Sequence, residues 1–96
     1  MAKVVWLHSA TEDAIRLFYF LETKDQPAAK RMLQAVETGA ERILKSPRIG
    51  FLRGDDRREF YIQFGDGYYV LRYILDAEQN VIIIRVWHSR EDRNPV

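Results

Sequence analysis

The chain has 96 residues, the size of one small domain and too short for two independent hydrophobic cores. Its 47% hydrophobic and 12% aromatic residues exclude a disordered chain, and the absence of cysteine excludes disulfides, a thiolate nucleophile and a cysteine-based zinc site. The net charge is +1, from 15 basic and 14 acidic residues, which counts against a broad nucleic-acid-binding surface but leaves room for a local basic patch.

Targeting and ligand signals are absent from the sequence pattern. The first apolar run is interrupted at His8 and is too short for a signal peptide or a membrane span. His8 and His88 are the only histidines, and the carboxylates do not have metal-ligand spacing. No glycine-rich phosphate loop precedes a helix. We therefore expect a cytoplasmic protein with one domain over residues 1–96, no metal, no cofactor and no membrane contact.

The N-terminal third predicts a strand followed by a helix. Residues 3–8 form a short β-branched and aromatic run, typical of a strand. Ser9 and Glu12 have the spacing of a capping box, which predicts that the helix begins there. Apolar residues then recur every three or four positions to about residue 22, with Leu17, Phe18 and Leu21 on one stripe.

A second helix follows after a very short connection. Asp25 suits the N-cap and Pro27 suits the first turn, and the apolar pattern continues to a stop at Ser46-Pro47. Two helices joined so closely are expected to form an antiparallel hairpin.

The C-terminal half predicts three strands. Residues 47–56 are rich in turn formers, and the strand patterns cover residues 58–64, 68–75 and 81–86. The last of these is apolar almost throughout, as expected of a central strand. The predicted order is βααβββ, an α+β fold with the helix hairpin packed on a small antiparallel sheet and the first strand at one edge.

Several motifs, in this order, resemble those of the RelE/ParE toxin superfamily. They cover nearly the whole chain: Pro27-Ala28-Ala29, Ser46-Pro47-Arg48-Ile49-Gly50, Arg58-Glu59-Phe60, Gly67-Tyr68-Tyr69-Val70-Leu71-Arg72-Tyr73 and Ile84-Arg85-Val86-Trp87-His88-Ser89-Arg90-Glu91-Asp92. The resemblance implies the toxin of a type II toxin–antitoxin system, neutralised in a hetero-oligomer by its cognate antitoxin. Two activities occur in the superfamily: ribosome-dependent mRNA cleavage in the RelE branch and poisoning of DNA gyrase in the ParE branch.

One substitution separates the two branches. RelE-like nucleases carry an Arg near the start of the strand after the β-hairpin, where this chain has Tyr69, and their lysine-rich stretch is replaced here by Arg53-Gly-Asp-Asp-Arg57. The missing Arg and the low net charge favour the ParE branch, which acts by binding gyrase and needs no catalytic residue. The alternatives are a ribosome-dependent endoribonuclease and a non-toxic member that only binds antitoxin.

If the chain were a nuclease, the resemblance points to Arg72, Arg85 and His88 as its catalytic residues. The alternation of the strands could also place Arg72 and Arg85 together as an anion site, or each could pair with a carboxylate such as Glu59 on a neighbouring strand. His88 could be a general acid or base, or it could only cap the sheet by hydrogen bonding.

The remaining candidates are contact residues. We expect an amphipathic antitoxin segment to cross the helix hairpin and a sheet edge and to bury Phe18, Phe20 and Leu21. For the target, the resemblance suggests the tail and the loop before Arg58, and the candidate contacts are Arg57, Arg58, Arg85, His88, Arg90 and Arg93.

Overall fold

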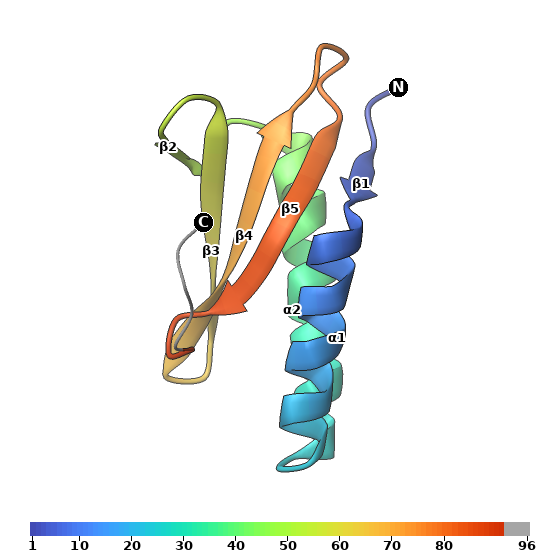
Figure 1. Cartoon of the computed structure of the whole chain (residues 1–96), viewed down its shortest axis with the longest axis vertical. Helices are drawn as coiled ribbons and strands as arrows, with labels where there is room; N and C mark the ends of the chain where they lie inside the picture. Colours follow the sequence, from blue (N-terminus) through green and yellow to red (C-terminus); the bar gives the residue numbers. More distant parts are fainter. Residues whose placement is uncertain (92–96) are drawn as a thin grey trace.

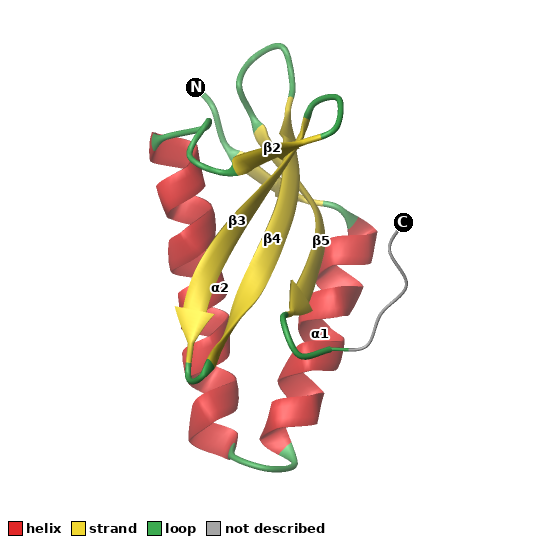
Figure 2. Cartoon of the chain, turned by 90° about the vertical axis from the view of Figure 1, so that its left-hand side faces the viewer, coloured by secondary structure: helices red, strands yellow, loops and turns green. Residues whose placement is uncertain are grey.

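The computed structural model describes residues 1–91 as two helices packed on one face of a five-stranded sheet (Figures 1 and 2). The elements in chain order are β1 (Val4–Trp6), α1 (His8–Glu22), α2 (Gln26–Lys45), β2 (Phe51–Arg53), β3 (Arg57–Phe64), β4 (Gly67–Leu75) and β5 (Val81–His88). The strand order across the sheet is β1-β5-β4-β3-β2. The predicted α+β class, the antiparallel helix hairpin and the position of the first strand at a sheet edge are confirmed (Figure 1).

Two details of the predicted sheet are wrong. β1 pairs in parallel with β5, from Val4 opposite Val81 to Trp6 opposite Ile83, so the sheet is mixed and not purely antiparallel. The turn-rich connection also contains β2, which pairs antiparallel with the start of β3. β2 has only three residues, all exposed, which is too short to give a recognisable alternation of polar and apolar residues.

The start of α1 also differs from its prediction. The helix begins at His8, and its N-cap is Leu7, which has no side chain to cap an amide. β1 ends at Trp6, so the β5 backbone beyond Ile83 has no strand partner on that side. The Ser9 hydroxyl donates a 2.8 Å hydrogen bond to the carbonyl of Ile84. Ser9 therefore provides a hydrogen-bond donor for a backbone carbonyl on the edge of β5 and does not cap its own helix.

The start of α2 agrees with the prediction. The Asp25 side chain accepts a 3.1 Å hydrogen bond from the amide of Ala28, and Pro27 lies in the first turn. This cap fixes the tight turn between the helices, so the hairpin presents one apolar face to the sheet. Neither helix of the described chain is long and apolar enough to span a membrane.

The core lies between the helix hairpin and the sheet. On β4 and β5 the side chains directed at the helices include Leu71, Tyr73, Ile83 and Val86, which are at most 1% exposed. The phenol of Tyr73 also reaches the loop after α2: it donates to the carbonyl of Pro47 at 2.7 Å and accepts from the amide of Gly50 at 2.9 Å. The core thereby fixes the connection that leads into β2.

Candidate functional site

A buried carboxylate on α1 organises the end of β5. Asp13 accepts hydrogen bonds from Arg85 at 2.7 and 3.1 Å and from the backbone amide of Val86 at 2.9 Å. Arg16, one turn along α1, pairs with Asp13 at 3.3 Å and also with Glu91. Burial alone would raise the pKa of Asp13, but these donors outweigh it and hold the pKa below the ordinary value. Asp13 is therefore ionised and fully engaged.

A second ion pair lies on the open side of the sheet. Arg72 on β4 donates to Glu59 on β3 at 2.8 and 3.2 Å, and the Tyr61 hydroxyl donates to the same carboxylate at 3.0 Å. Burial would raise the pKa of Glu59, but these hydrogen bonds and the charges of Arg72 and Arg53 keep it lowered. The guanidinium of Arg72 also lies over the Trp87 ring, 4.9 Å from its centroid.

Arg72 and Arg85 are direct partners across β4 and β5, the juxtaposition that strand alternation allowed. Their guanidinium groups, however, bind different carboxylates, Glu59 for Arg72 and Asp13 for Arg85. Of the two interpretations left open by the sequence, pairing with carboxylates describes these side chains. The Asp13 partner was missed, although a carboxylate on the buried stripe of an amphipathic helix signals a hidden cation.

His88 ends β5 with a neutral, oriented imidazole. Its Nδ1 accepts a 3.1 Å hydrogen bond from the amide of Arg90, which assigns the proton to Nε2. Burial, and secondarily the charge of Arg90, lower the pKa of His88 below its ordinary value. The ring packs edge-on against Tyr69, with 4.8 Å between centroids. No carboxylate among the described residues orients this imidazole as a general base requires.

The predicted target contacts do not form one patch. Arg57 and Arg58 open β3, and Arg58 donates to the carbonyls of Arg48 and Gly50. At the opposite end of β3, Arg90 pairs with Asp66 in the β3–β4 turn at 3.0 Å. His88, opposite Tyr69, lies toward that same end of the sheet, whereas Arg85 is opposite Arg72, which is opposite Glu59 next to Arg58. Arg93 lies outside the described residues.

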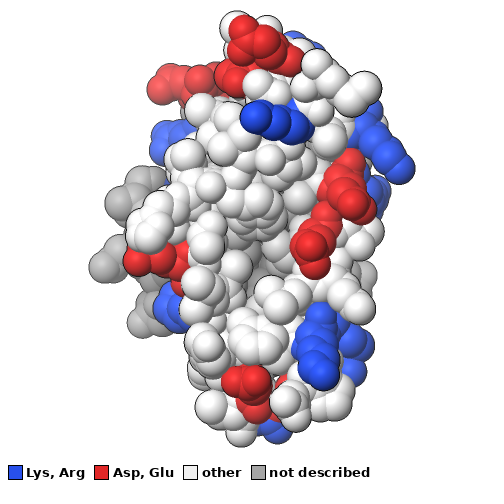
Figure 3. Space-filling view, turned by 90° about the vertical axis from the view of Figure 1, so that its right-hand side faces the viewer, with Lys and Arg blue, Asp and Glu red and all other residues white. Residues whose placement is uncertain are grey.

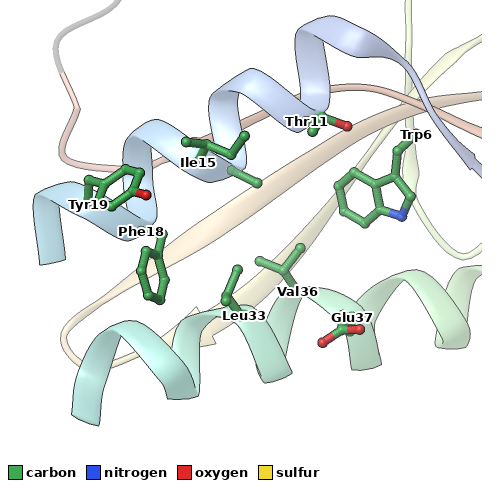
Figure 4. A pocket seen from close by; sticks show the side chains of 9 residues that line it. Trp6, Thr11, Ile15, Phe18, Tyr19, Leu33, Val36 and Glu37 are labelled. Atoms are coloured by element: carbon green, nitrogen blue, oxygen red, sulfur yellow. The ribbon is translucent and has the colours of Figure 1, made fainter. Parts of the chain in front are cut away.

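An apolar groove runs between the two helices on the outer face of the hairpin. This helix groove has a volume of about 350 Å³. Its lining includes Trp6, Ile15, Phe18, Tyr19, Leu33 and Val36. In Figure 4 the side chains of Phe18 and Leu33 point toward each other across the groove, and Trp6 lies at its other end. The surface in Figure 3 is uncharged and hollowed at its centre, and acidic and basic side chains surround it.

A second hollow lies on the other side of α1. This hairpin hollow, about 620 Å³, is bordered by α1, the β3–β4 turn and the end of β5. Its apolar wall consists of Leu17, Phe20, Leu21 and Phe64, and Tyr69 and His88 also line it. The three predicted antitoxin contacts are therefore separated: Phe18 lies in the helix groove, and Phe20 and Leu21 lie in the hairpin hollow.

Within residues 1–91, no group of three or more His, Asp and Glu side chains is placed to hold a metal ion. The two buried carboxylates of this part of the chain, Asp13 and Glu59, are each paired with an arginine. Their chemistry is that of structural pairs and not that of a ligand set.

Comparison with known proteins gives a consistent result. Residues 4–93 match the family model described as "ParE toxin of type II toxin-antitoxin system, parDE". The chain is 34% identical over 84 residues to "Toxin RelE1" of Caulobacter vibrioides. This alignment covers 88% of this chain and 89% of that protein. It is 31% identical over 84 residues to "Toxin RelE3" of the same organism, covering 88% of this chain and 90% of that protein.

Proposed function

The chain belongs to the ParE toxin family of type II toxin–antitoxin systems, and from this premise we propose that it inhibits DNA gyrase by binding and does not cleave RNA. One observation carries the proposal: the two arginines that a nuclease would use are each held by a carboxylate of the same chain, Arg72 by Glu59 and Arg85 by Asp13. A gyrase target also implies a cytoplasmic protein.

The chemistry of RNA cleavage makes this pairing important. Attack of a 2′-hydroxyl on the phosphate needs cations that stabilise the developing charge and a group that moves protons. A guanidinium already bound by a carboxylate contributes little extra positive potential to a phosphate, because the two charges largely cancel. Tyr69 occupies the position at which the nuclease branch has another Arg, and its side chain is 2% exposed.

The second candidate is the ribosome-dependent endoribonuclease, which the RelE names of both relatives favour. In that case Arg72, Arg85 and His88 would have to reorganise on the ribosome. The imidazole of His88 would act as the general acid or base only after its Nδ1 gave up the hydrogen bond from the Arg90 amide.

Expression of the chain without antitoxin separates the candidates in the cell. The gyrase proposal expects loss of negative supercoiling from a reporter plasmid and no new mRNA 5′ ends within codons. Codon-internal cuts that disappear in His88→Ala would overturn it. His88→Ala is a sharper variant than Arg85→Ala, because Arg85→Ala also leaves the buried Asp13 unpaired. Unimpaired growth with unchanged supercoiling would identify a non-toxic member that only binds antitoxin.

The family implies an antitoxin partner, and we propose the helix groove as its main binding site. The groove lies between the two antiparallel helices, and most of the side chains that line it are apolar, as an amphipathic helix requires; Thr11 and Glu37 also line it (Figure 4). Its rim contains Tyr19 and Ile15, which are 60% and 51% exposed, and a charged border surrounds it (Figure 3). Of the predicted antitoxin contacts, Phe18 belongs to this site.

A further inference from the structure

The outer edge of β3 carries backbone groups that the fold leaves unpaired. β2 lies opposite only the first three residues of this strand. The turn after β3 closes on the pair of Phe64 and Gly67, so Phe64 and every second residue before it bond to β4. Tyr61 and Gln63 alternate with them and direct their N–H and C=O groups away from β4, and no other backbone group of residues 1–91 bonds to them. Beyond the end of β2, the sheet therefore has an edge that can pair with one more strand.

α2 runs beside this edge and makes a groove of it (Figure 2). The groove has a volume of about 420 Å³ and lies between α2 and β3. Its floor is apolar, formed by Ala35 and Gly39 of α2 and by Phe60 and Ile62 of β3. A Cβ at Gly39 would overlap the side chain of Ile62, so glycine lets the helix approach the strand this closely. Because side chains alternate along a strand, one added beside β3 places every second side chain on this floor.

Two cations of α2 stand at the groove without a carboxylate partner. Arg31 and Arg42 both line it, and neither has an ion pair within residues 1–91, unlike Arg72 and Arg85. Arg42 lies over the ring of Phe60, with its guanidinium carbon 5.2 Å from the ring centroid, which holds the charge beside the strand. None of the described residues that line the groove is acidic. The charge of the groove therefore favours an occupant that carries carboxylates.

We propose that the open edge of β3 binds an extended acidic segment of a partner protein, which joins the sheet as an antiparallel strand in line with β2. Its backbone pairs with Tyr61 and Gln63, an apolar side chain lies on the groove floor, and carboxylates on either side of that residue lie against Arg31 and Arg42. Strand addition takes its affinity from main-chain hydrogen bonds and its specificity from alternate side chains.

The spacing of the cations fits a strand. Arg31 and Arg42 are about three turns apart on α2, which is about 16 Å along the helix axis. A strand covers this distance in about five residues, so two carboxylates on the same face of a short segment reach both guanidinium groups. The groove shares no lining residue with the helix groove, so the proposal does not rest on the antitoxin site or on gyrase as the target.

The test is an amide NMR titration of the purified chain with two peptides that differ only in charge. The acidic probe is acetyl-Thr-Glu-Thr-Val-Thr-Glu-Thr-amide, in which both Glu and the Val share one face of a strand, and the basic probe has Lys in place of each Glu. The acidic probe is expected to bind at least about tenfold more tightly, because two attractive contacts replace two repulsive ones. The perturbed amides should lie in residues 60–64 and 31–42. Equal affinity of the two probes, no saturable binding, or perturbation confined to the helix groove would overturn the proposal.

Charge reversal assigns the preference to the two arginines. Arg31→Glu is expected to weaken binding of the acidic probe about fivefold. Lys30→Glu is the matched control: it changes the net charge equally at the next position of α2 but does not line the groove, so binding should stay within about twofold. The double variant Arg31→Glu, Arg42→Glu should prefer the basic probe. All three positions are exposed, so the variants should keep the fold. A preference for the acidic probe that persists in the double variant would contradict the role of the arginines.

N-methylated peptides test the strand pairing itself. In the proposed register, the third and fifth peptide positions lie opposite Gln63 and Tyr61 and donate their N–H groups to β3. Methylation of both nitrogens should weaken binding at least about tenfold, since it removes two main-chain hydrogen bonds. Methylation of the central Val nitrogen, which points away from β3, is the control and should leave the affinity within about threefold. Equal effects of the two modifications would rule out strand addition at this edge.

Discussion

At the scale of single residues, Asp13 is the group on which the end of the sheet depends. It joins α1 to β5 through a guanidinium and a backbone amide, over a sequence separation of more than 70 residues. The backbone of β5 needs this acceptor because β1 is too short to pair with it there. The interaction couples the N-terminal helix to the strand that ends at His88.

We predict that Asp13→Asn lowers the free energy of unfolding by about 2 kcal/mol. The amide can still accept from Val86 but no longer balances the charge of Arg85. The side chain of Arg85 is 39% exposed, so water screens the loss and keeps it below the values for a broken, fully buried pair. Urea denaturation measures the difference. Glu12→Gln is the control, because its pair with His8 is largely exposed and should change stability by less than about 0.5 kcal/mol.

The same pair predicts a specific pH dependence. The pKa of Asp13 is lower in the folded chain than its ordinary value of 3.8, so the folded state favours the carboxylate. Its contribution is complete above pH 3.8 and is lost as the pH falls below that value toward the folded pKa. The stability difference between the wild type and Asp13→Asn should therefore shrink between about pH 4 and pH 2. A difference that stays constant over this range would mean that the carboxylate charge is not the stabilising feature.

At the scale of elements, α1 acts both as a helix and as a cover for a sheet edge. Ser9 and Asp13 satisfy backbone groups of β5 that a longer β1 would have paired. An exposed strand edge is a site for unwanted pairing, and α1 covers this one. The opposite edge of the sheet, β2, is held differently. The loop that leads into β2 is anchored by hydrogen bonds from Pro47 and Gly50 to the hydroxyl of the core residue Tyr73.

Tyr73→Phe is predicted to destabilise the chain by about 1–3 kcal/mol, because it leaves the amide of Gly50 and the carbonyl of Pro47 without their partner. Tyr68→Phe makes the same chemical change at an exposed site and should leave stability unchanged within about 0.5 kcal/mol. Thermal and urea unfolding of the two variants measure the difference. Equal stability of both would show that the Tyr73 hydroxyl does not anchor the connection.

Local signals account for what the sequence predicted correctly. The Asp25 cap, the stop at Ser46-Pro47 and the apolar periodicity all act within a few residues, so both helices and their hairpin were predictable. The errors involve distant partners. Ser9 bonds to Ile84 and β1 pairs with β5, and neither partner is visible from the neighbourhood of the N-terminus. A three-residue strand such as β2 leaves no periodic pattern at all.

At the scale of the whole molecule, α1 separates two apolar depressions of different character. The helix groove is an open trough between helices, whereas the hairpin hollow is bordered by α1, the β3–β4 turn and the end of β5. The sequence placed Phe18, Phe20 and Leu21 in one contact surface because they are close along the helix. At about 100° per residue, Phe20 lies about 160° around the helix from Phe18, and Leu21 lies between them, so Phe18 faces the helix groove and the other two face the hairpin hollow.

The two depressions predict a clear result for antitoxin binding. Ile15→Glu places a charge in the helix groove and should weaken antitoxin binding at least a hundredfold, because an apolar contact is replaced by an unpaired carboxylate. Leu52→Glu is the matched control, since Leu52 on β2 is 55% exposed, close to the 51% of Ile15, and lies outside the groove. Calorimetric titration with the cognate antitoxin compares them. Equal weakening by both, or by neither, would move the antitoxin site elsewhere.

The proposed mode of action is a property of the molecule as a whole, because it rests on the pairing of its cations. The arginines at the nuclease positions are neutralised within the chain, and the other candidate target contacts lie at both ends of β3. Such a surface suits contact with a protein better than catalysis on a phosphate. The sequence predicted the pairing of Arg72 with Glu59 as one of two interpretations. It did not predict the pairing of Arg85 with Asp13, because only the fold brings α1 next to β5.

The most direct measurement is a supercoiling assay with purified gyrase, relaxed plasmid and increasing amounts of the purified chain. Binding to gyrase predicts inhibition at micromolar toxin and reversal by stoichiometric cognate antitoxin, with no RNA cleavage by the same preparation. Unchanged supercoiling at these concentrations, with ribosome-bound mRNA cleaved by the same preparation, would contradict the proposal.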